Sequence, residues 1–519
     1  MDFAPFLNAT FPIPEEEGPD KRLPLAEAVA RFTRPGQTLY LATTHGRPMA
    51  AMYQIARRWW GRAPGFTVVA LGLGTPTNVL VHGGLASRLV STFFGDSYPT
   101  PGPNRVLARA FASKSAAFEF WTIWTLPLRL KAGALDVPFL TTKSLLGSTM
   151  EAENAAAFRR VRDPFGEGEV GAVAALKPDV TFVHAIAADR SGNAILTPPW
   201  GDGGGGVLGA REGVVVTAER IVPRSFLRRH AHLVKVPGYK VLGVCEVPYG
   251  AHPSGVANPG VPEIAAYADD YAFVEEGRAA SRNEETFEKW VREWVLDLPD
   301  HEAYLGRLGK DRLWGLRGKA EGDSWIAELQ GLWERIDFAA PPSPIERMVL
   351  AGGRALAERM REAGLRTILA GVGASNLSAW LAQREIKAEG GDAELMAEIG
   401  MYGYHPRAAD PFIFNYRNMP TCTMLAEMET IIGMCVSGEG ARAVGAIGAA
   451  QVDRAGNVNS TRLGDATLLV GSGGANDIAS AAREVLVTMV MGEGGRFVEK
   501  VDYVTSPGRA VRTVVSERG

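Results

Sequence analysis

A glutamate among glycines and a glycine-rich turn are the two features of the sequence that could do chemistry. Glu398 lies in the stretch AEIGMYGYHP, residues 397–406, where glycines and aromatic residues surround one acidic side chain. The turn is GSGG, residues 471–474, between the apolar segment ATLLV and a predicted helix that begins near Asn476. Successive glycines let several backbone N–H groups point one way at the positive end of a helix. Such a turn suits a phosphate or the oxyanion of an attacked carbonyl.

The residue types around the turn help to separate these two ligands. A nucleotide-binding phosphate loop carries a Lys followed by Ser or Thr, and residues 471–474 are not followed by this pair. The turn itself contains no Lys or Arg. The sequence therefore favours an oxyanion site for acyl transfer. A lone glutamate is usually a solvated surface charge, so the assignment of a reactive role to Glu398 depends on this turn.

Two other glycine turns follow the order strand, turn, helix. LGLGTPTN at 71–78 follows the apolar run FTVVA, and GVGASN at 371–376 follows the run TILA. Both lack the third glycine of the dinucleotide-binding fingerprint, and neither has a convincing acidic partner about 20 residues further on. We therefore do not expect a dinucleotide cofactor. A fourth glycine run at 201–206 predicts a flexible loop.

The sequence repeats itself. The motif Asp-Arg-x-Gly-Asn occurs at 189–193 and again at 453–457, each time after an apolar run and downstream of one of the two related glycine turns. Asp and Asn can bond their own backbone in a turn, and Gly adopts positive φ there. The repeat indicates a duplicated unit with a larger insertion in its first copy. The predicted fold class is α/β, with two tandem, structurally related open α/β domains.

A segment of different character separates the two copies. Residues 275–344 are predicted to be a helical extension and a Pro-rich linker, between a first domain at 1–274 and a second at 345–519. Helical spacing predicts a core or interface face for the apolar residues of two helices in the extension. These residues are Phe287, Trp290, Trp294 and Val295, together with the stripe within 325–338. The prolines of AAPPSP end any helix there, and a new amphipathic helix is predicted to end at Gly364.

Composition excludes several function classes. The chain has 519 residues, 46% hydrophobic and 22% charged, with a net charge of −3, so we expect no nucleic-acid or membrane-surface partner. No apolar run reaches the length of a membrane span. Three cysteines show no metal-binding or disulfide spacing, and no His, Cys and Asp cluster predicts a metal site. Together with the lack of a secretory signal in the first residues, this predicts a cytoplasmic location.

The chain resembles family I CoA-transferases of the glutaconate CoA-transferase type, with α- and β-subunit-like halves fused head to tail. The resemblance covers nearly the whole chain apart from its N-terminal segment and the linker. The two specific motifs are Glu-x-Gly at 398–400 and Val-Gly-x-Gly-Gly-Ala at 470–475. The motifs that mainly identify the fold are RLKAGALDVPFLTTKSLLGS (129–148), LKPDVTFVHAIAADRSGNA (176–194), VVVTAERIV (214–222), GVGASNLSAWLA (371–382) and DRAGNVNST (453–461).

This resemblance implies a mechanism and a set of site residues. Glu398 matches the family's nucleophile, which forms an acyl-glutamyl anhydride and then a glutamyl-CoA thioester. The substrates are an acyl-CoA and a carboxylic acid, no cofactor is permanently bound, and the exposed faces leave room for a homodimer. The residues matched to the oxyanion and CoA-binding turns are Gly471, Gly473, Gly474, Ala475, Gly371, Gly373 and Asn376.

Two alternatives stay open at this stage. Ala397 and Ile399 stand where the strict family motif has Ser and Asn, so the neighbours that tune the glutamate differ. Some relatives hydrolyse carbon–carbon bonds in CoA thioesters of steroid-ring breakdown with a glutamate of the α-like half, which here corresponds to Glu119. A non-catalytic CoA-binding protein is the other alternative. A related decarboxylase with cysteine at the nucleophile position is disfavoured, because that position is Glu398.

Overall fold

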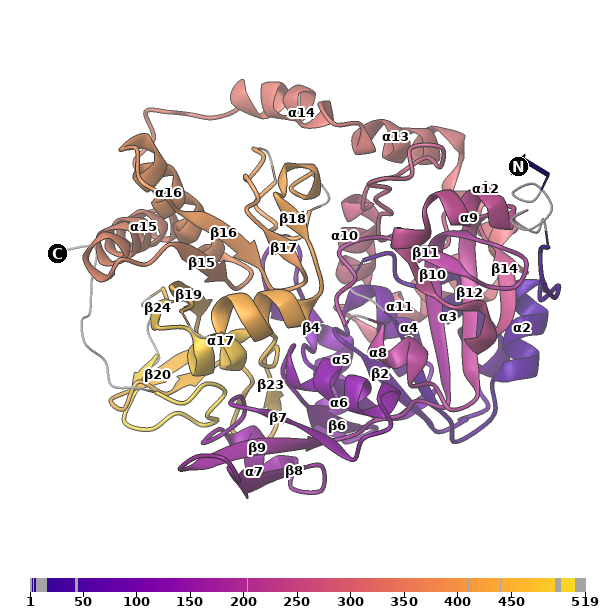
Figure 1. Ribbon diagram of the computed structural model, residues 1–519. Coiled ribbons are helices and arrows are strands. Elements are labelled where there is room, and N and C mark those ends of the chain that lie inside the picture. Colours follow the sequence, from indigo (N-terminus) through magenta and orange to yellow (C-terminus); the bar gives the residue numbers. More distant parts are fainter. Residues whose placement is uncertain are drawn as a thin grey trace.

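Two α/β halves, joined by a helical strap, make up the computed structural model of the chain (Figure 1). The first half contains the larger sheet and the second half a six-stranded one. The structure describes residues 2, 4–5, 16–42, 45–202, 204–408, 410–415, 417–438, 440–490 and 496–508.

The first half is organised around one fully buried strand, β10 (Val180–Ala188). Its mainly apolar sequence, interrupted by Thr181 and His184, is typical of a parallel strand covered on both faces. It pairs in parallel with β1 (Thr38–Leu41) on one side and β12 (Gly213–Ile221) on the other. The sheet continues through β2 (Phe66–Ala70), β3 (Ala86–Ser91) and β6 (Ala117–Phe120) beyond β1, through β14 (Val241–Glu246) beyond β12, and through the antiparallel β11 (Ala194–Leu196) and β13 (Val234–Val236).

Helices and small sheets complete this half. Each of α2 and α3 has an apolar face that is buried in the core. The helices are α2 (Leu25–Phe32), α3 (Met49–Trp59), α4 (Asn78–His82), α5 (Arg105–Ser113), α6 (Thr125–Ala134), α7 (Thr149–Glu153), α8 (Gly205–Leu208) and α9 (Arg224–Arg229). The smaller strands are β4 (Gly95–Asp96), β5 (Gly102–Pro103), β7 (Phe139–Thr142), β8 (Phe158–Arg162) and β9 (Glu169–Ala174).

The second half repeats the strand, glycine turn and helix order of the first. Its sheet order is β18-β17-β16-β15-β19-β24, and β16, β15, β19 and β24 are parallel. β2 and β15 precede the two glycine turns, and β10 and β19 precede the two Asp-Arg-x-Gly-Asn motifs. In the first half, β1 lies between β2 and β10, whereas in the second half β15 and β19 pair directly. The elements are α15 (Pro344–Ala363), β15 (Thr367–Ala370), α16 (Ala374–Ala388), β16 (Glu394–Ala397), β17 (Met401–Tyr402), β18 (Met424–Leu425), β19 (Ala443–Gly448), β20 (Gln451–Asp453), β21 (Val458–Asn459), β22 (Arg462–Leu463), β23 (Thr467–Leu468), α17 (Ala475–Ala481), β24 (Glu484–Thr488) and β25 (Phe497–Val498).

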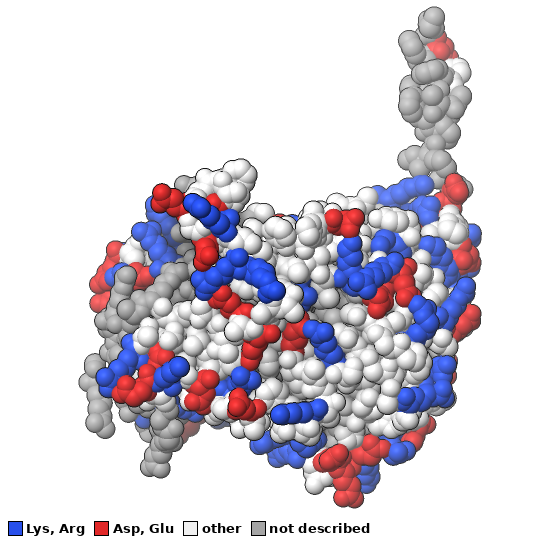
Figure 2. Space-filling view, turned by 90° about the horizontal axis from the view of Figure 1, so that it is seen from below, with Lys and Arg blue, Asp and Glu red and all other residues white. Residues whose placement is uncertain are grey.

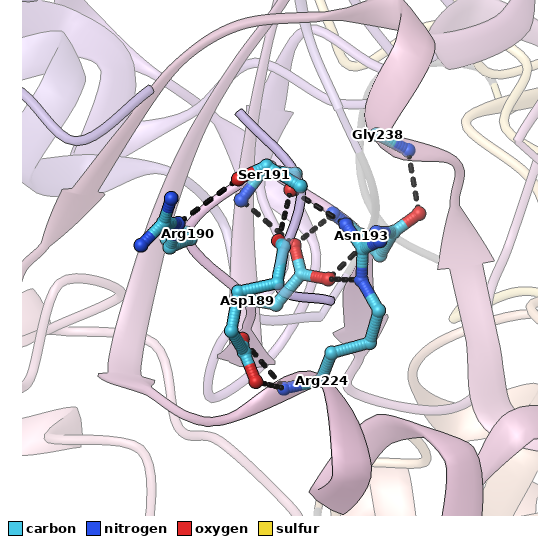
Figure 3. A network of polar contacts seen from close by, with 8 residues as sticks. Asp189, Arg190, Ser191, Asn193, Arg224 and Gly238 are labelled. Atoms are coloured by element: carbon cyan, nitrogen blue, oxygen red, sulfur yellow. Dashed lines mark hydrogen bonds and ion pairs between the residues drawn. The ribbon is translucent and has the colours of Figure 1, made fainter. Parts of the chain in front are cut away.

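The repeated Asp-Arg-x-Gly-Asn motif forms the same turn in both halves. Oδ1 of Asp189 accepts backbone N–H bonds from Ser191 and Asn193, at 2.9 and 3.0 Å, and Oδ2 accepts the Asn193 side-chain amide at 2.7 Å (Figure 3). Asp453 accepts the same three bonds from Ala455 and Asn457, each at 3.0 Å. Two turns with one bonding pattern support the duplication. The predicted α/β class with two related domains is confirmed by the fold.

The two apolar stripes of the extension have different fates. The first is buried as predicted: Phe287 and Val295 are 0% exposed. For the second, an interface face stays a prediction, but a core face is wrong, since no residue of α14 (Ser324–Trp333) is buried and Trp333 is 59% exposed. The reason is that α13 and α14 run over the outside of the molecule between the halves (Figure 1). The other helices here are α10 (Tyr271–Ala280), α11 (Glu284–Val291), α12 (His301–Leu308) and α13 (Lys310–Ala320).

The second half opens with the helix that the sequence predicted. α15 begins after Ser343, whose side chain accepts the N–H of Glu346 while the Glu346 carboxylate accepts that of Ser343. It ends at Gly364, with φ of 63°. The domain boundaries at 274/275 and 344/345 stay predictions.

The surface fits the composition. On the face shown in Figure 2, basic and acidic side chains are interspersed rather than gathered by sign. None of the helices in the described part of the chain has both the length and the apolar character needed to span a membrane.

We predict that the two repeated turns differ in their contribution to stability. Asp189 also accepts Arg224 Nε at 3.0 Å and is 0% exposed, whereas Asp453 has no arginine partner among the described residues. Asp189→Ala is expected to lower the free energy of unfolding by about 2–4 kcal/mol, and Asp453→Ala by about 1–3 kcal/mol. Urea denaturation measures both. Arg454→Ala, which removes an exposed ion pair with Glu499, is the control and is expected to cost under about 1 kcal/mol. Equal losses for both aspartates would contradict the prediction.

Candidate active site

Glu398 lies in a tight hairpin between β16 and β17. Ala397 pairs with Met401, so Glu398, Ile399 and Gly400 form a three-residue loop. Gly400 has φ of 126°, and a Cβ there would lie 2.1 Å from the Ala426 carbonyl oxygen. Glycine is therefore required at this position, and the hairpin fixes the direction of the Glu398 side chain.

The first half holds the glycine turn 471–474 by backbone hydrogen bonds. Phe94 N–H donates to Val470 O at 2.6 Å, and Gly473 N–H donates to Thr92 O at 2.8 Å. Ile123 N–H donates to Gly473 O at 2.9 Å. Three bonds between segments far apart in sequence place the turn at the boundary of the two halves.

This placement brings Glu398 and the glycine turn together, as the sequence predicted. A Cβ on Gly474 would lie 2.0 Å from Glu398 Oε2 and 3.3 Å from Cγ2 of Ile123. The carboxylate thus occupies the space that any side chain at position 474 would need. Only glycine permits this approach, because the nearest atom belongs to a buried group.

The Glu398 carboxyl group is buried and poorly hydrogen-bonded. It is 7% exposed, and among the described residues Oε2 has no hydrogen-bond partner. Burial raises the pKa of Glu398 to about 8, and the negative charge of Asp477 adds to the increase. A carboxylate that is desolvated and unpaired is a stronger nucleophile than one bound by donors.

Asp477 is a functional candidate that the sequence reasoning missed. It lies in the first turn of α17, is 0% exposed and accepts bonds from Thr122 Oγ1 at 2.6 Å and Trp124 N–H at 3.1 Å. Burial raises the pKa of Asp477 to about 7, although donors including Ser144 oppose the increase. The available signal was an acidic residue directly after the specific motif, in VGSGGAND.

The structure corrects the expectation for most of the turn's amides. Gly471 N–H donates to Ser460 O at 3.3 Å, Gly473 N–H to Thr92 O, and Ala475 N–H to Ser472 O at 2.9 Å. An amide with an internal acceptor is not available to an oxyanion. Among the described residues, the N–H of Gly474 has no such acceptor, and the Cβ position of Gly474 lies against Glu398 Oε2.

The second predicted turn is occupied by structural contacts. Gly371 N–H donates to Ala446 O at 2.8 Å, and Gly373, with φ of 109°, packs against Pro101 of the first half. The Asn376 side chain donates to Pro411 O at 3.1 Å and accepts the hydroxyl of Tyr404 at 3.4 Å. These bonds hold a loop and a helix together and do not involve Glu398.

Glu119 is placed as a structural carboxylate. On β6 it accepts bonds from Arg129 at 2.8 Å, from Trp121 Nε1 at 2.6 Å and from Arg88. Burial acts to raise the pKa of Glu119, but the two arginines and the indole outweigh it and hold that pKa below its usual range. Its lone pairs are used by fixed donors, in contrast to those of Glu398.

The glycine run 201–206 joins the two halves beside the hairpin. Its residues 205 and 206 belong to the short helix α8, so the prediction of a flexible loop is wrong for that part; residue 203 lies outside the described residues. Gly201 O accepts Met428 N–H at 2.9 Å, and Pro199 Cβ lies 2.9 Å from the Cβ position of Gly400. The loop therefore covers one side of the Glu398 hairpin.

Residues 23–246 and 424–517 match the family model for coenzyme A transferase, which covers more than half of the chain. The chain belongs to the coenzyme A transferase family. Its homologues carry CoA-transferase names, so it is an enzyme of the transferase class. The resemblance inferred from the motifs is confirmed.

Curated relatives of the family match as separate subunits. One subunit of glutaconate CoA-transferase from Acidaminococcus fermentans is 28% identical over 57% of this chain and 94% of its own length. The other subunit of that enzyme is 35% identical over 22% of this chain and 46% of its own length. One subunit of 3-oxoadipate CoA-transferase from Pseudomonas knackmussii is 28% identical over 56% of this chain and 99% of its own length. One transferase chain thus contains counterparts of both subunits.

Solved structures agree on the fold. The crystal structure of glutaconate CoA-transferase from Acidaminococcus fermentans superposes with a TM-score of 0.52 at 26% identity, over 57% of this chain and 95% of that one. An acyl-CoA transferase from Escherichia coli O157:H7, in a thioester complex with CoA, has a TM-score of 0.64 and covers 96% of this chain and 87% of its own. At 16% identity the second likeness shows the fold alone.

We predict that Glu398→Gln stabilises this transferase in a pH-dependent way. The folded protein keeps the Glu398 proton up to about pH 8, whereas the unfolded chain releases it near pH 4.5. Between these values the wild type loses stability as the pH rises, because the folded state binds more protons. The gain of the variant should therefore grow with pH, by up to about 1.4 kcal/mol per unit, and level off above about pH 8.

Thermal melts at pH 5, 7 and 9 measure this gain. Glu394→Gln, on the same strand and ion-paired with Lys387, is the control for loss of a carboxylate nearer the surface. A gain that shrinks as the pH rises would contradict the raised pKa of Glu398.

Proposed function

We propose that this protein moves CoA between an acyl-CoA and a carboxylic acid, with Glu398 as the nucleophile. The observation that carries the proposal is the buried Oε2, which has no hydrogen-bond partner among the described residues and lies against Gly474. A positioned and desolvated carboxylate attacks a thioester well. The Gly474 amide, without an internal acceptor in the described structure, is the donor that we propose for the attacked carbonyl oxygen as it gains charge.

The reaction proceeds in two symmetrical halves. Glu398 attacks the thioester carbonyl of the donor, the C–S bond breaks, and CoA leaves as its thiolate while an acyl-glutamyl anhydride forms. The thiolate then attacks the glutamyl carbonyl, which releases the donor acid as its carboxylate and leaves a glutamyl-CoA thioester. The acceptor acid reverses these steps and leaves with CoA.

The acceptor class follows from the relatives. The two curated enzymes are named for glutaconate and 3-oxoadipate, which are both dicarboxylic acids, so we propose a dicarboxylate acceptor. The steroid-ring hydrolase using Glu119 is favoured by no observation, because that carboxylate is bound by two arginines. The cytoplasmic location and the homodimer stay predictions.

We predict that Glu398 can be trapped as a covalent thioester. Incubation with acetyl-CoA, butyryl-CoA or glutaryl-CoA and then with borohydride should reduce the glutamyl-CoA and inactivate the wild type irreversibly. Glu398→Gln should show no trapping and a loss of transfer to glutaconate of at least about 10³-fold, because a catalytic nucleophile is missing. Intact-mass spectrometry and a transfer assay measure these effects.

Glu119→Gln is the matched control for this experiment. If it still forms the thioester, the nucleophile is Glu398. Normal trapping in Glu398→Gln, or ring-opening hydrolysis lost only in Glu119→Gln, would overturn the proposed function.

We predict that two glycines of one turn respond differently to an added methyl group. Gly474→Ala must displace the Glu398 carboxylate, so kcat should fall by about 10²-fold or more. In Gly473→Ala, the added Cβ lies 3.8 Å from Phe93, an ordinary contact. The φ of 49° at this position should lower the free energy of unfolding by about 1 kcal/mol and leave kcat nearly unchanged. Steady-state kinetics and thermal melts separate the two. Equal kcat values for both variants would count against the arrangement.

A further inference from the structure

We propose that Asp477 is a positioning residue whose negative charge destabilises the Glu398 carboxylate and so favours the neutral, covalent states of Glu398. The proposal rests on the proposed function, since it concerns the glutamyl-CoA thioester. It assigns a task to the second buried carboxyl group of the site, which the reaction sequence itself does not use.

The two carboxyl groups are placed by the same short segment. Glu398 Oε2 lies against Gly474, and Asp477 follows three residues later, at the start of α17. Asp477 is fully buried, so bulk water screens its charge only weakly. Its orientation is fixed from the first half by Thr122 Oγ1 at 2.6 Å and Trp124 N–H at 3.1 Å.

The surrounding donors decide which of the two groups keeps the charge. Trp124 offers Asp477 an N–H, which can only donate. Thr122 Oγ1 accepts the N–H of Thr125 at 3.0 Å and lies 2.8 Å from Thr125 Oγ1; with the Thr125 hydroxyl as the donor in that contact, the proton of Thr122 points at Asp477. Glu398 Oε2 has no such donor among the described residues. When the two groups hold one proton between them, that proton therefore lies on Glu398, and the negative charge lies on Asp477.

The segments around the site carry further ionisable groups. The loop that covers the hairpin contains Asp202, and burial raises the pKa of that carboxyl to about 6. Lys131 pairs with Glu429, and Lys235 with Glu427. Ser144 and Thr122 face Asp477 as neutral hydroxyls. Of the described ionisable groups, Asp477 is the one whose charge raises the pKa of Glu398.

This charge changes the balance between free enzyme and thioester. In the first half-reaction, the Glu398 carboxylate and an acyl-CoA become glutamyl-CoA and the free donor carboxylate. The negative charge leaves the site with the donor acid, so the repulsion from Asp477 disappears. Asp477 therefore shifts the equilibrium towards the thioester by the same factor by which it suppresses ionisation of Glu398.

The test uses Asp477→Asn in the full-length chain with acetyl-CoA and glutaryl-CoA. The acid limb of the pH profile of kcat/KM should move to lower pH by about one unit. The ratio of thioester to free enzyme, measured by intact mass above pH 9, should fall by the matching factor of about ten. Both the position of the limb and this ratio depend on the free energy of the ionised Glu398 carboxylate. A purely structural role would not move these two readouts together.

Two further variants keep the test decisive if Asp477→Asn does not fold. Thr122→Val removes the hydroxyl that stabilises the negative charge of Asp477, so Asp477 is protonated in a larger fraction of the molecules. Activity should then extend to lower pH, by less than in Asp477→Asn. Asp477→Glu restores the charge and should return the limb towards its wild-type position.

The outcomes separate this proposal from the proposed function. If the wild type forms a thioester but the limb and the thioester ratio stay unchanged in Asp477→Asn and in Thr122→Val, the role of Asp477 is overturned alone. A limb that moves to higher pH overturns it as well. If the wild type itself forms no thioester with either acyl-CoA, the proposed function fails, and the role of Asp477 fails with it.

Discussion

The backbone pairing between residues 92–94 and the turn 470–473 is the constraint on which the site depends. It joins strand ends of two separate sheets through hydrogen bonds that require close approach of main chains. That approach puts Ile123 over Gly474 and closes the space around Glu398. Neither half contains the whole arrangement, so residues of the first half help to bury Glu398 of the second. Relatives that divide the same parts between two subunits fit this dependence.

Environment, rather than residue type, distinguishes the candidate glutamates. Glu119 and Glu398 are both largely buried, yet the pKa of one is lowered and that of the other is raised. Ion pairs with Arg88 and Arg129 offset the desolvation free energy of the Glu119 carboxylate. Of the ionisable groups in the described part of the chain, Asp477 is the one that acts on the pKa of Glu398, and its charge is negative, so the charge of Glu398 stays costly. Similar burial thus accompanies a structural ion pair in one place and a carboxyl group with a raised pKa in the other.

Local patterns of the sequence predicted a large part of this architecture. The Asp-Arg-x-Gly-Asn turns and the helix that ends at Gly364 depend on contacts within a few residues, which composition and spacing encode, and helical periodicity predicted the aromatic face around Phe287. A core face for the stripe of α14 was predicted wrongly for the opposite reason. Periodicity states that a helix has an apolar face, but whether another element covers that face depends on where the chain leads the helix.

The sequence alone singled out a glutamate before a glycine hairpin and a run of glycines before a helix as the candidate site. Only the tertiary structure decided which amide is available to a ligand. The Gly473 N–H donates to the Thr92 carbonyl oxygen, whereas the Gly474 N–H has no acceptor among the described residues. It also decided that Asp477 faces the site, held by Thr122. The physical reason is that hydrogen-bond acceptors and buried charges act over a few ångströms, and the groups concerned are hundreds of residues apart in the chain.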